Sequence, residues 1–378
     1  MIGAKASTTD NNMKTLRIMT FNIWGGGVNE NKPINDTVAV IRAANADIVG
    51  MQETRAEECS PGVGESAAKA IATALGFYYH EQTHVDYDPL TYAIWDNAII
   101  SRHPILHGTK NKIGVKIDAG DGLTVFAFNL HLPDFPYQPY QLLNITYGDA
   151  PFLTKGEEAV DAAKQARGNS MEKFYSDLEE VGEDDVVFVV GDFNEPSYLD
   201  WTDNAAKAGY HPLKVEFPTS KKLVEEYGFV DALRHVYPDE VGNPAFTWPV
   251  EEVLDPKFCP VYHKDRIDFV YVRGTGTNVL DAAVVGEEPS VADIVCSSYR
   301  SDHRAVVATV SWEKAEKNST AIFAAKAGKT SVATYTPMAK ATKKMFRPEA
   351  KADKTKSIPV AKASKMFKTK EVNVPKDD

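Results

Sequence analysis

The chain has 378 residues, a length that fits one large α/β domain better than one small domain. Hydrophobic residues make up 43% and charged residues 25%, which is typical of a globular protein and excludes collagen-like and fully disordered chains. The net charge of −11 hides two opposed parts. Residues 313–378 hold 16 Lys and Arg against 7 Asp and Glu, whereas residues 1–312 hold 26 against 46. A body this acidic repels polyanions unless metal ions or a local basic groove offset its charge.

No apolar run approaches the roughly 18 residues of a membrane helix, and residues 1–13 lack the apolar core of a secretory signal. Three cysteines, Cys59, Cys259 and Cys296, are too few and too widely spaced for a disulfide framework or a zinc site. We therefore expect no transmembrane segment, favour a cytoplasmic location and expect a monomer.

Residues 1–13 are polar and aperiodic, and we expect a flexible arm there. From residue 14 to 312, short apolar runs of the β type alternate with helix-like segments, which predicts an α/β fold with covered sheet faces. The predicted strands are Leu16–Trp24, Ile48–Gln52, Ala98–Ser101, Thr124–Leu132, Val186–Val190, Asp268–Val272 and Arg304–Val310. The predicted helices are Asn35–Ala44, Gly64–Leu75 and Lys155–Glu180, with Gly168 as a candidate break in the last.

Beyond Trp312 the composition turns to Ala, Lys, Thr, Ser and Pro without a steady period. We expect residues 313–378 to form a disordered basic tail. Residues 337–346 and 359–367 resemble each other. They are either two copies of a docking motif or a chance similarity within a solvated tail, and the second is the commoner case.

Polar residues stand where the apolar strands should end. Side chains repeat every two residues along a strand, so Asn22 shares a face with Trp24, and Asp192 shares one with Asn194. Strand ends gather the sites of α/β proteins. Taken singly, each such residue is more often a turn, a cap or a hydrogen-bonded core residue. The joint pattern favours a site, and its candidate members are Asn22, Glu53, His131, Asp192, Asn194, Asp268, Asp302 and His303.

In this order the segments resemble the endonuclease/exonuclease/phosphatase superfamily, which includes deoxyribonucleases, abasic-site endonucleases, neutral sphingomyelinases, inositol polyphosphate 5-phosphatases and deadenylases. The resemblance implies one catalytic domain over residues 14–312. It also implies a four-layer α/β/β/α sandwich, in which two mixed β-sheets pack face to face with helices outside. The matching segments are TFNIW (20–24), MQET (51–54), NAIISRHPI (97–105), FNLHL (128–132), VVGDFN (189–194), DRIDFVYV (265–272) and SDHRAVV (301–307).

The same resemblance implies a metal site. Glu53 matches the principal Mg²⁺ ligand, Asp302 matches a second acidic ligand, and Asn22 supports the metal directly or through water. Hard oxygen ligands suit Mg²⁺, with Mn²⁺ as the substitute. Whether one or two ions bind is left open.

The resemblance also implies catalytic roles. Asp192 and Asn194 match the pair that orients the attacking water and a phosphate oxygen. His303 matches the histidine at the scissile phosphate, Asp268 matches its carboxylate partner, and His131 matches a second histidine that stabilises charge or helps the leaving group. The general base is either Asp192 or His303.

Substrate contacts are less constrained by the sequence. Residues 133–148 (PDFPYQPYQLLNITYG) follow His131 directly. They form either an aromatic flap that recognises substrate, with Tyr137 and Tyr140, or a packed Pro-rich loop. Arg167 either reaches the phosphate from a helix or is an exposed helical arginine.

These observations predict Mg²⁺-dependent hydrolysis of a phosphoester, more specifically a diester. Residues 262–266 (YHKDR) lack the Trp-Cys-Asp-Arg signature of 5-phosphatases, and IWGGG after Asn22 is closer to sphingomyelinases than to abasic-site enzymes. The sequence contains no Arg/Lys-rich, Tyr-bearing loop of the kind that forms a DNA clamp. A small or lipid phosphodiester therefore leads. An endo- or exodeoxyribonuclease aided by the basic tail is the first alternative. A catalytically inactive binding module is disfavoured because every motif position is filled.

Overall fold

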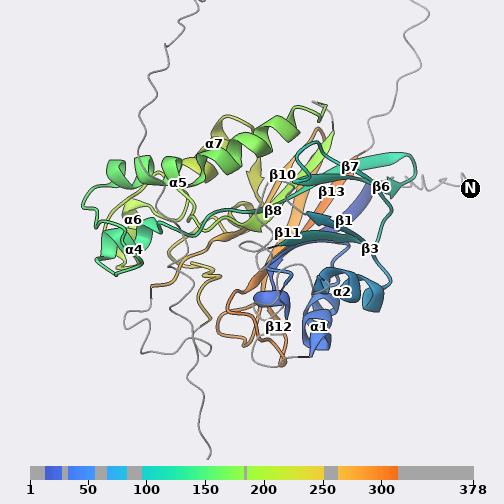
Figure 1. Cartoon of the computed structure of the whole chain (residues 1–378), viewed down its shortest axis with the longest axis horizontal. Coiled ribbons are helices and arrows are strands. Elements are labelled where there is room, and N and C mark those ends of the chain that lie inside the picture. Colours follow the sequence, from blue (N-terminus) through green and yellow to red (C-terminus); the bar gives the residue numbers. More distant parts are fainter. Residues whose placement is uncertain are drawn as a thin grey trace, which may run out of the picture. The chain divides into compact units, whose positions relative to one another are not determined.

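Two β-sheets packed face to face form the centre of the protein in a computed structural model (Figure 1). The structure describes residues 13–27, 33–55, 66–82, 96–182, 185–250 and 263–313. All of them belong to one unit, Met1–Ala315. The predicted arm, up to residue 12, and the predicted tail after residue 313 lie outside the described residues.

The first sheet has seven strands in the order β12-β11-β13-β1-β2-β4-β3. It is mixed, because β1 pairs in parallel with β2 and antiparallel with β13. Its strands are β1 (Met13–Asn22), β2 (Ile48–Gln52), β3 (Tyr78–Gln82), β4 (Asn97–Ser101), β11 (Thr277–Gly286), β12 (Ile294–Val295) and β13 (Ala305–Glu313).

The second sheet has six strands in the order β5-β6-β7-β8-β10-β9. The parallel pair β7 and β8 lies at its centre, and β10 runs antiparallel to β8. Its strands are β5 (Ile105–Gly108), β6 (Gly114–Gly120), β7 (Leu123–His131), β8 (Val186–Asp192), β9 (Val230–Asp231) and β10 (Asp268–Arg273).

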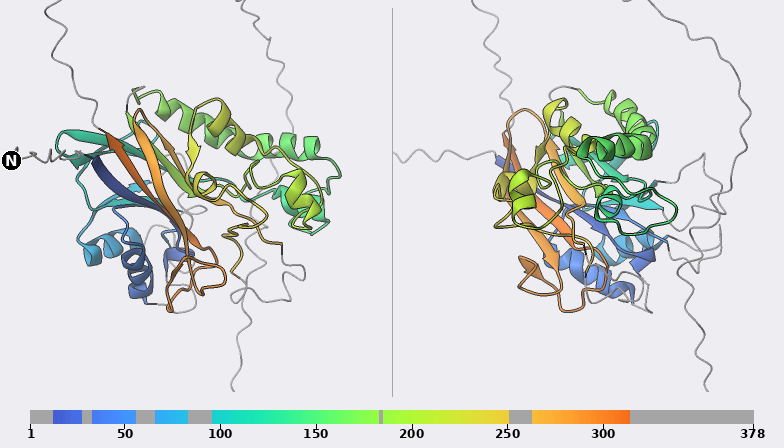
Figure 2. Two further views of the ribbon diagram at one scale, coloured as in Figure 1. Left: turned by 180° about the vertical axis from the view of Figure 1, so that it is seen from behind. Right: turned by 90° about the vertical axis from the view of Figure 1, so that its left-hand side faces the viewer.

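Helices cover the outer face of each sheet (Figure 2). Helices α1 (Ile34–Ala44) and α2 (Ala67–Leu75) pack on the first sheet, and α5 (Gly156–Leu178) and α7 (Pro218–Glu225) pack on the second. The predicted four-layer α/β/β/α sandwich is therefore confirmed. The shorter helices are η1 (Gly25–Gly27), α4 (Gln138–Leu143), α6 (Asp203–Lys207) and α8 (Ala232–Val236).

The two sheets approach each other closely at Gly50 on β2. A Cβ atom there would lie 2.4 Å from Val190 Cγ2 and 2.7 Å from Asn129 Oδ1, so only glycine fits. Beside it, Gln52 Nε2 donates to Asn129 Oδ1 at 2.6 Å, and Asn129 Nδ2 donates to the Met51 carbonyl at 2.9 Å. This buried amide bridge joins the sheets next to the ends of β2 and β7, and it sets their separation there.

The seven predicted strands all occur, with ends shifted by up to three residues. Two expectations need correction. Strand β1 ends at Asn22 instead of Trp24, and α5 continues through Gly168 without a break. In the ranges that the structure describes, no helix is both long and apolar enough to cross a membrane.

Candidate active site

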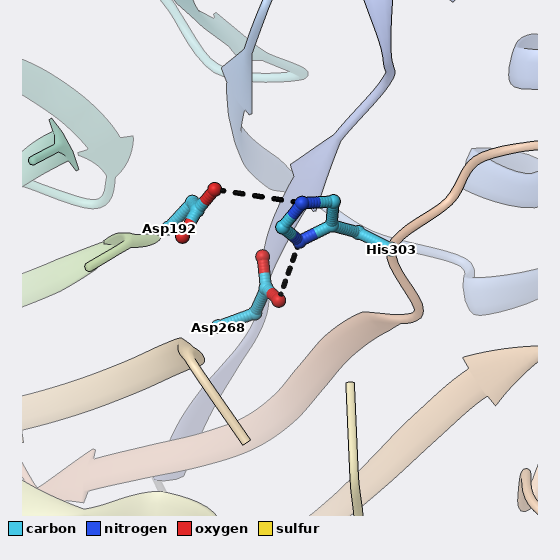
Figure 3. A group of neighbouring side chains, drawn as sticks. All are labelled: Asp192, Asp268 and His303. Atoms are coloured by element: carbon cyan, nitrogen blue, oxygen red, sulfur yellow. Dashed lines mark hydrogen bonds and ion pairs between the residues drawn. The ribbon is translucent and has the colours of Figure 1, made fainter. Parts of the chain in front are cut away.

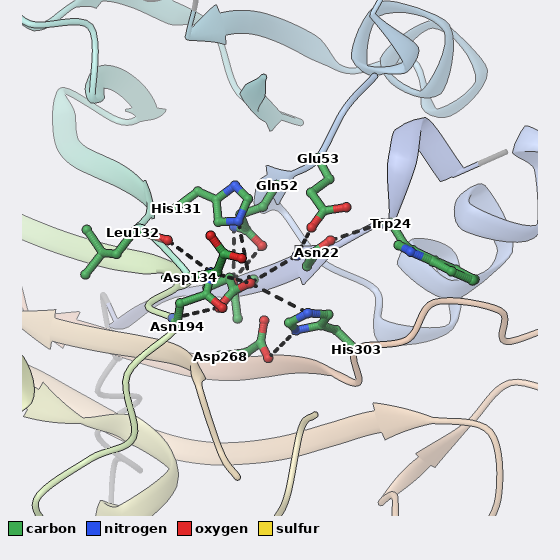
Figure 4. Close-up of polar contacts among 12 residues, drawn as sticks. Asn22, Trp24, Gln52, Glu53, His131, Leu132, Asp134, Asn194, Asp268 and His303 are labelled. Carbon is green, nitrogen blue, oxygen red and sulfur yellow. Dashed lines mark hydrogen bonds and ion pairs between the residues drawn. The ribbon is translucent and has the colours of Figure 1, made fainter. Parts of the chain in front are cut away.

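Polar side chains from both sheets converge at one end of the sandwich (Figure 4). Strands β1 and β2 are parallel, as are β7 and β8, so the carboxyl ends of each pair lie at one edge of their sheet. Asn22 ends β1, Glu53 follows β2, His131 ends β7 and Asp192 ends β8. Strand β10 is antiparallel to β8, so its first residue, Asp268, is paired with Asp192. The strand ends thus bring the predicted residues together.

His303 lies between two buried carboxylates (Figure 3). Its Nδ1 donates to Asp268 Oδ2 at 2.9 Å, and its Nε2 lies 3.6 Å from Asp192 Oδ2. Burial alone lowers the pKa of His303, but Asp268, Asp192 and Asp302 outweigh it and raise that pKa well above its usual range. The Asp268 contact fixes the ring so that Nε2 faces Asp192.

Asp192 is held from three sides. Its Oδ1 accepts from the main-chain nitrogen of Asn194 at 2.9 Å, and its Oδ2 accepts from Asn22 Nδ2 at 3.1 Å. His131 Nε2 lies 3.7 Å from the same Oδ2. Burial raises the pKa of Asp192 to about 7, against the opposing effect of positive His303. This carboxylate is therefore fixed and flanked by both histidines.

Glu53 stands on the opposite side of Asn22. Asn22 Nδ2 donates to Glu53 Oε1 at 3.0 Å, and the main-chain nitrogen of Gly25 donates to Oε2 at 3.2 Å. The backbone of Glu53 is left-handed, with φ 56°, a conformation that is uncommon outside glycine. Burial, reinforced by Asp302, raises the pKa of Glu53 to about 8.

The acidic side of this site fits a divalent cation. Burial raises the pKa of Glu53 and that of Asp302, and positive His303 offsets this effect only in part. Asp302 Oδ1 is buried and has no hydrogen-bond partner among the described residues. Carboxylate oxygens are the ligands that Mg²⁺ and Mn²⁺ prefer. A second candidate set is Asp192, Asp268 and His303, whose ligand atoms lie within 4.8 Å of one another.

Strand alternation does not position two of the predicted residues, Asn194 and Trp24. Asn194 follows β8 in a left-handed turn, with φ 48°, and its Nδ2 donates to the Leu132 carbonyl at 3.0 Å. Trp24 is also left-handed, with φ 52°, and its ring points away from the cluster (Figure 4). The expectation that strand faces align these residues is therefore wrong, since both strands end before them.

The three weaker candidates for substrate contact are buried. Arg167 is 1% exposed, so the expectation of an exposed helical arginine is wrong. Tyr137 and Tyr140 are 4% and 8% exposed, and the Tyr137 hydroxyl donates to Asp265 Oδ2 at 2.6 Å. Tyr140 lies against Trp248, with ring centroids 6.1 Å apart. The packed-loop interpretation suits both tyrosines.

Thr247 supports the site but is not among the residues predicted from the sequence. Its buried Oγ1 accepts from the main-chain nitrogens of Ile267 at 3.0 Å and Asp268 at 3.2 Å. Its carbonyl accepts from the main-chain nitrogen of Arg304 at 2.7 Å. Thr247 therefore ties the segment carrying Asp268 to the segment carrying His303. No sequence signal marks it, because its partners are main-chain atoms about 20 or more residues away.

The chain is similar to several known proteins. The chain is 29% identical over 274 residues to the uncharacterized protein F14F9.5 of Caenorhabditis elegans, covering 71% of this chain and 82% of that protein. An endonuclease/exonuclease/phosphatase structure from Beutenbergia cavernae aligns with 79% of this chain and 72% of its own, at 18% identity and a TM-score of 0.49. An AP endonuclease from Archaeoglobus fulgidus aligns with 78% of this chain and 98% of its own, at 19% identity and a TM-score of 0.46.

The family assignment follows from a match over most of the chain. The profile of the Endonuclease/Exonuclease/phosphatase family matches residues 19–303, a range that begins before Asn22 and ends on His303. The matched range contains all eight residues that the sequence singles out for metal binding and catalysis. The chain therefore belongs to the Endonuclease/Exonuclease/phosphatase family of hydrolytic phosphoesterases.

Proposed function

We propose that this protein hydrolyses a phosphodiester by in-line attack of water, with Mg²⁺ or Mn²⁺ as its cofactor. The observation that carries the proposal is the buried line Asp268–His303–Asp192, which continues through Asn22 to the carboxylate of Glu53. The site thus combines a fixed histidine, a fixed carboxylate and the acidic pair Glu53 and Asp302, which fits a divalent cation. Such groups favour hydrolysis of an anionic ester, because they take a proton and stabilise the negative charge that develops.

The chain's own groups supply the proton chemistry. His303, held on Nδ1 by Asp268, presents Nε2 to the site, and His131 approaches Asp192 on another side. Negative charge grows on the non-bridging oxygens during attack, and the two histidines would stabilise it. The proton of the water passes to the Asp192–His303 pair, whose facing atoms are 3.6 Å apart. The bond from phosphorus to the leaving oxygen breaks as the new one forms, and His131 would protonate that oxygen. A cation bound by Glu53 and Asp302 would supply Lewis-acid charge to a phosphate oxygen.

A small or lipid phosphodiester is the substrate class that charge favours. Residues 1–312 carry 46 acidic against 26 basic side chains, which opposes the approach of a polyanion. A partly exposed aromatic ring lies beside the histidine, since the Trp248 ring centroid is 6.3 Å from that of His303. Phe135, 39% exposed, packs on Tyr147 at 5.5 Å. Such rings suit an organic group attached to the phosphate.

An endo- or exodeoxyribonuclease is the second candidate. Residues 313–378 hold 16 basic and 7 acidic side chains, which favours a nuclease, because Lys and Arg neutralise the phosphates of nucleic acid. Contacts made by such a tail would show as a strong dependence of binding on salt.

A panel of phosphoesters with Mg²⁺, Mn²⁺ or Ca²⁺ tests the proposal. It includes bis-p-nitrophenyl phosphate, sphingomyelin, inositol phosphates, RNA, plasmid DNA and an abasic duplex. We expect cation-dependent turnover of a small or lipid diester that His303→Ala abolishes. Turnover restricted to DNA supports the second candidate. Absence of turnover on every ester, or turnover that His303→Ala leaves intact, contradicts the catalytic proposal.

A further inference from the structure

We propose that Arg167 is a positioning residue for the reaction, acting from α5 through the turn at Asn194 on the Asp192 carboxylate. This inference rests on the proposed hydrolysis of a phosphodiester. Arg167 touches neither the histidines nor the acidic pair in any contact described above. Its role is to hold the turn that aims Asp192.

The burial of Arg167 is the first observation. Arginine is almost never fully buried unless its guanidinium is paired, because removing a charge from water is costly. Here the side chain is 1% exposed, on the face of α5 that also buries Ala163 and Met171. A charged group in that position calls for an explanation other than surface solubility.

The partners of the guanidinium identify what it holds. Nη2 donates to the carbonyl oxygen of Asn194, and Nη1 donates to Gln138 Oε1 at 2.6 Å. The nearest carboxylate is that of Glu195, whose Oε2 lies 3.8 Å from Nη1. This oxygen has no hydrogen-bond partner among the described residues. The other oxygen of Glu195 accepts from the main-chain nitrogen of Thr219 at 2.8 Å. Glu195 thus offsets the positive charge of Arg167, while the hydrogen bonds of Arg167 go to the turn at Asn194 and to α4.

The turn needs to be held. Asn194 has φ 48°, in the left-handed region that few residues other than glycine and asparagine adopt. In this conformation its main-chain nitrogen donates to Asp192 Oδ1 at 2.9 Å, and its Nδ2 donates to the Leu132 carbonyl at 3.0 Å. Asn194 therefore accepts from Arg167 with its main-chain carbonyl and donates to Asp192 with its main-chain nitrogen. Loss of the guanidinium leaves a carbonyl without its donor and lets the turn relax away from Asp192.

The test uses three variants of the full chain. Arg167→Met with Glu195→Gln removes the guanidinium without leaving a buried, unpaired charge. Arg167→Lys keeps the charge but cannot reach Asn194 and Gln138 with two fixed donors. Lys164→Met is the matched control, because Lys164 lies one turn earlier on the same helix and is 61% exposed.

Two readouts separate positioning from stability. Hydrogen exchange of a peptide covering residues 190–198 reports opening of the turn and needs no activity. We expect exchange about tenfold faster or more in the double variant, with a smaller rise for Arg167→Lys and none for the control. On the best diester of the panel we expect kcat to fall by about 10- to 100-fold while KM changes by about twofold or less.

A double-mutant cycle completes the test. Asn194→Ala keeps the backbone carbonyl but loses the side-chain donor, so combining it with the Arg167 variants should cost less than the sum of the separate losses. Unchanged exchange and unchanged kcat in both Arg167 variants overturn the positioning role. Fully additive losses overturn it as well. If the wild-type protein hydrolyses no ester, the proposed function fails, and hydrogen exchange alone decides whether Arg167 holds the turn.

Discussion

Replacing Glu53 by glutamine tests the metal site most directly. The change removes one negative charge and keeps the shape of the side chain. A glutamine has a single acceptor oxygen, whereas Glu53 accepts from both Asn22 Nδ2 and the main-chain nitrogen of Gly25. One of these donors then faces an amide NH₂ group, and the lost hydrogen bond costs about 1 kcal/mol.

The raised pKa of Glu53 sets the sign of the pH dependence. In the absence of a cation, the folded protein keeps the Glu53 proton up to about pH 8, whereas the unfolded chain releases it near pH 4.5. The contribution of this group to stability is therefore present at low pH and lost as the pH rises through about 8. One pKa unit corresponds to about 1.4 kcal/mol, so the wild-type protein in EDTA loses on the order of a few kcal/mol from this group. For a domain of this size, that loss lowers Tm by several degrees.

Thermal unfolding at pH 5 and pH 8.5, in EDTA or in Mg²⁺, measures both effects. We expect Glu53→Gln to be slightly less stable than wild type at pH 5 and at least as stable at pH 8.5 in EDTA. Mg²⁺ should raise the Tm of the wild type at pH 8.5, because binding to the folded state stabilises it by about 2.7 kcal/mol at 100 times Kd. The variant should gain little and lose activity about 100-fold or more.

A control isolates the position of the charge. Glu225→Gln, on the half-exposed surface of α7, should follow the wild type in every condition. An equal Mg²⁺-dependent rise in Tm for Glu53→Gln and wild type would refute the assignment of Glu53 as a ligand, as would full activity of the variant at limiting Mg²⁺.

Three further predictions concern the histidine pair, its support and the basic tail. Asp268→Asn combined with His303→Ala should be little slower than His303→Ala alone, because Asp268 acts by orienting the ring; additive losses in steady-state kinetics would show independent roles. Thr247→Val leaves two main-chain nitrogens without an acceptor, so kcat should fall about tenfold with a loss of about 1–3 kcal/mol in unfolding free energy; wild-type kcat would contradict the link. Removal of residues 313–378 should spare turnover of a small diester, and if DNA is bound it should flatten the log–log salt dependence by about 0.9 for each lost phosphate contact.

The fold was predictable where the chain is strongly apolar. Val186–Val190 and Ile48–Gln52 lie in central strands, whose side chains are buried on both faces, so their continuous apolar runs are visible in the sequence. The edge strands were not predicted. Strand β3 exposes Tyr78 and Tyr79, and β5 spans only four residues, so neither carries the apolar pattern of a core strand. Short helices such as α4 depend on tertiary packing, which a local pattern does not record.

The candidate site was predictable as a set of residue types but not as a set of conformations. The motifs single out Glu53 and Asn194 by residue type and by their place in the sequence. The left-handed backbone that aims both residues is held by contacts with distant segments, such as Gly26, which donates to the Glu53 carbonyl, and Arg167, which donates to the Asn194 carbonyl. Arg167 itself resembled any helical arginine, since the partner that buries it lies 27 residues further along the chain.

Asn22 explains why the site needs both sheets. Its single amide group lies between Glu53, which follows a strand of the first sheet, and Asp192, which ends a strand of the second, at 3.0 and 3.1 Å. Two buried carboxylates this close repel each other, and the shared NH₂ group gives each one a donor. The amide oxygen is fixed in turn by the main-chain nitrogen of Trp24 at 3.0 Å, so the NH₂ group cannot rotate away. One neutral residue thereby joins Glu53, which we propose binds the cation, to Asp192, which we propose helps to activate water, and the position of each carboxylate depends on how the two sheets pack.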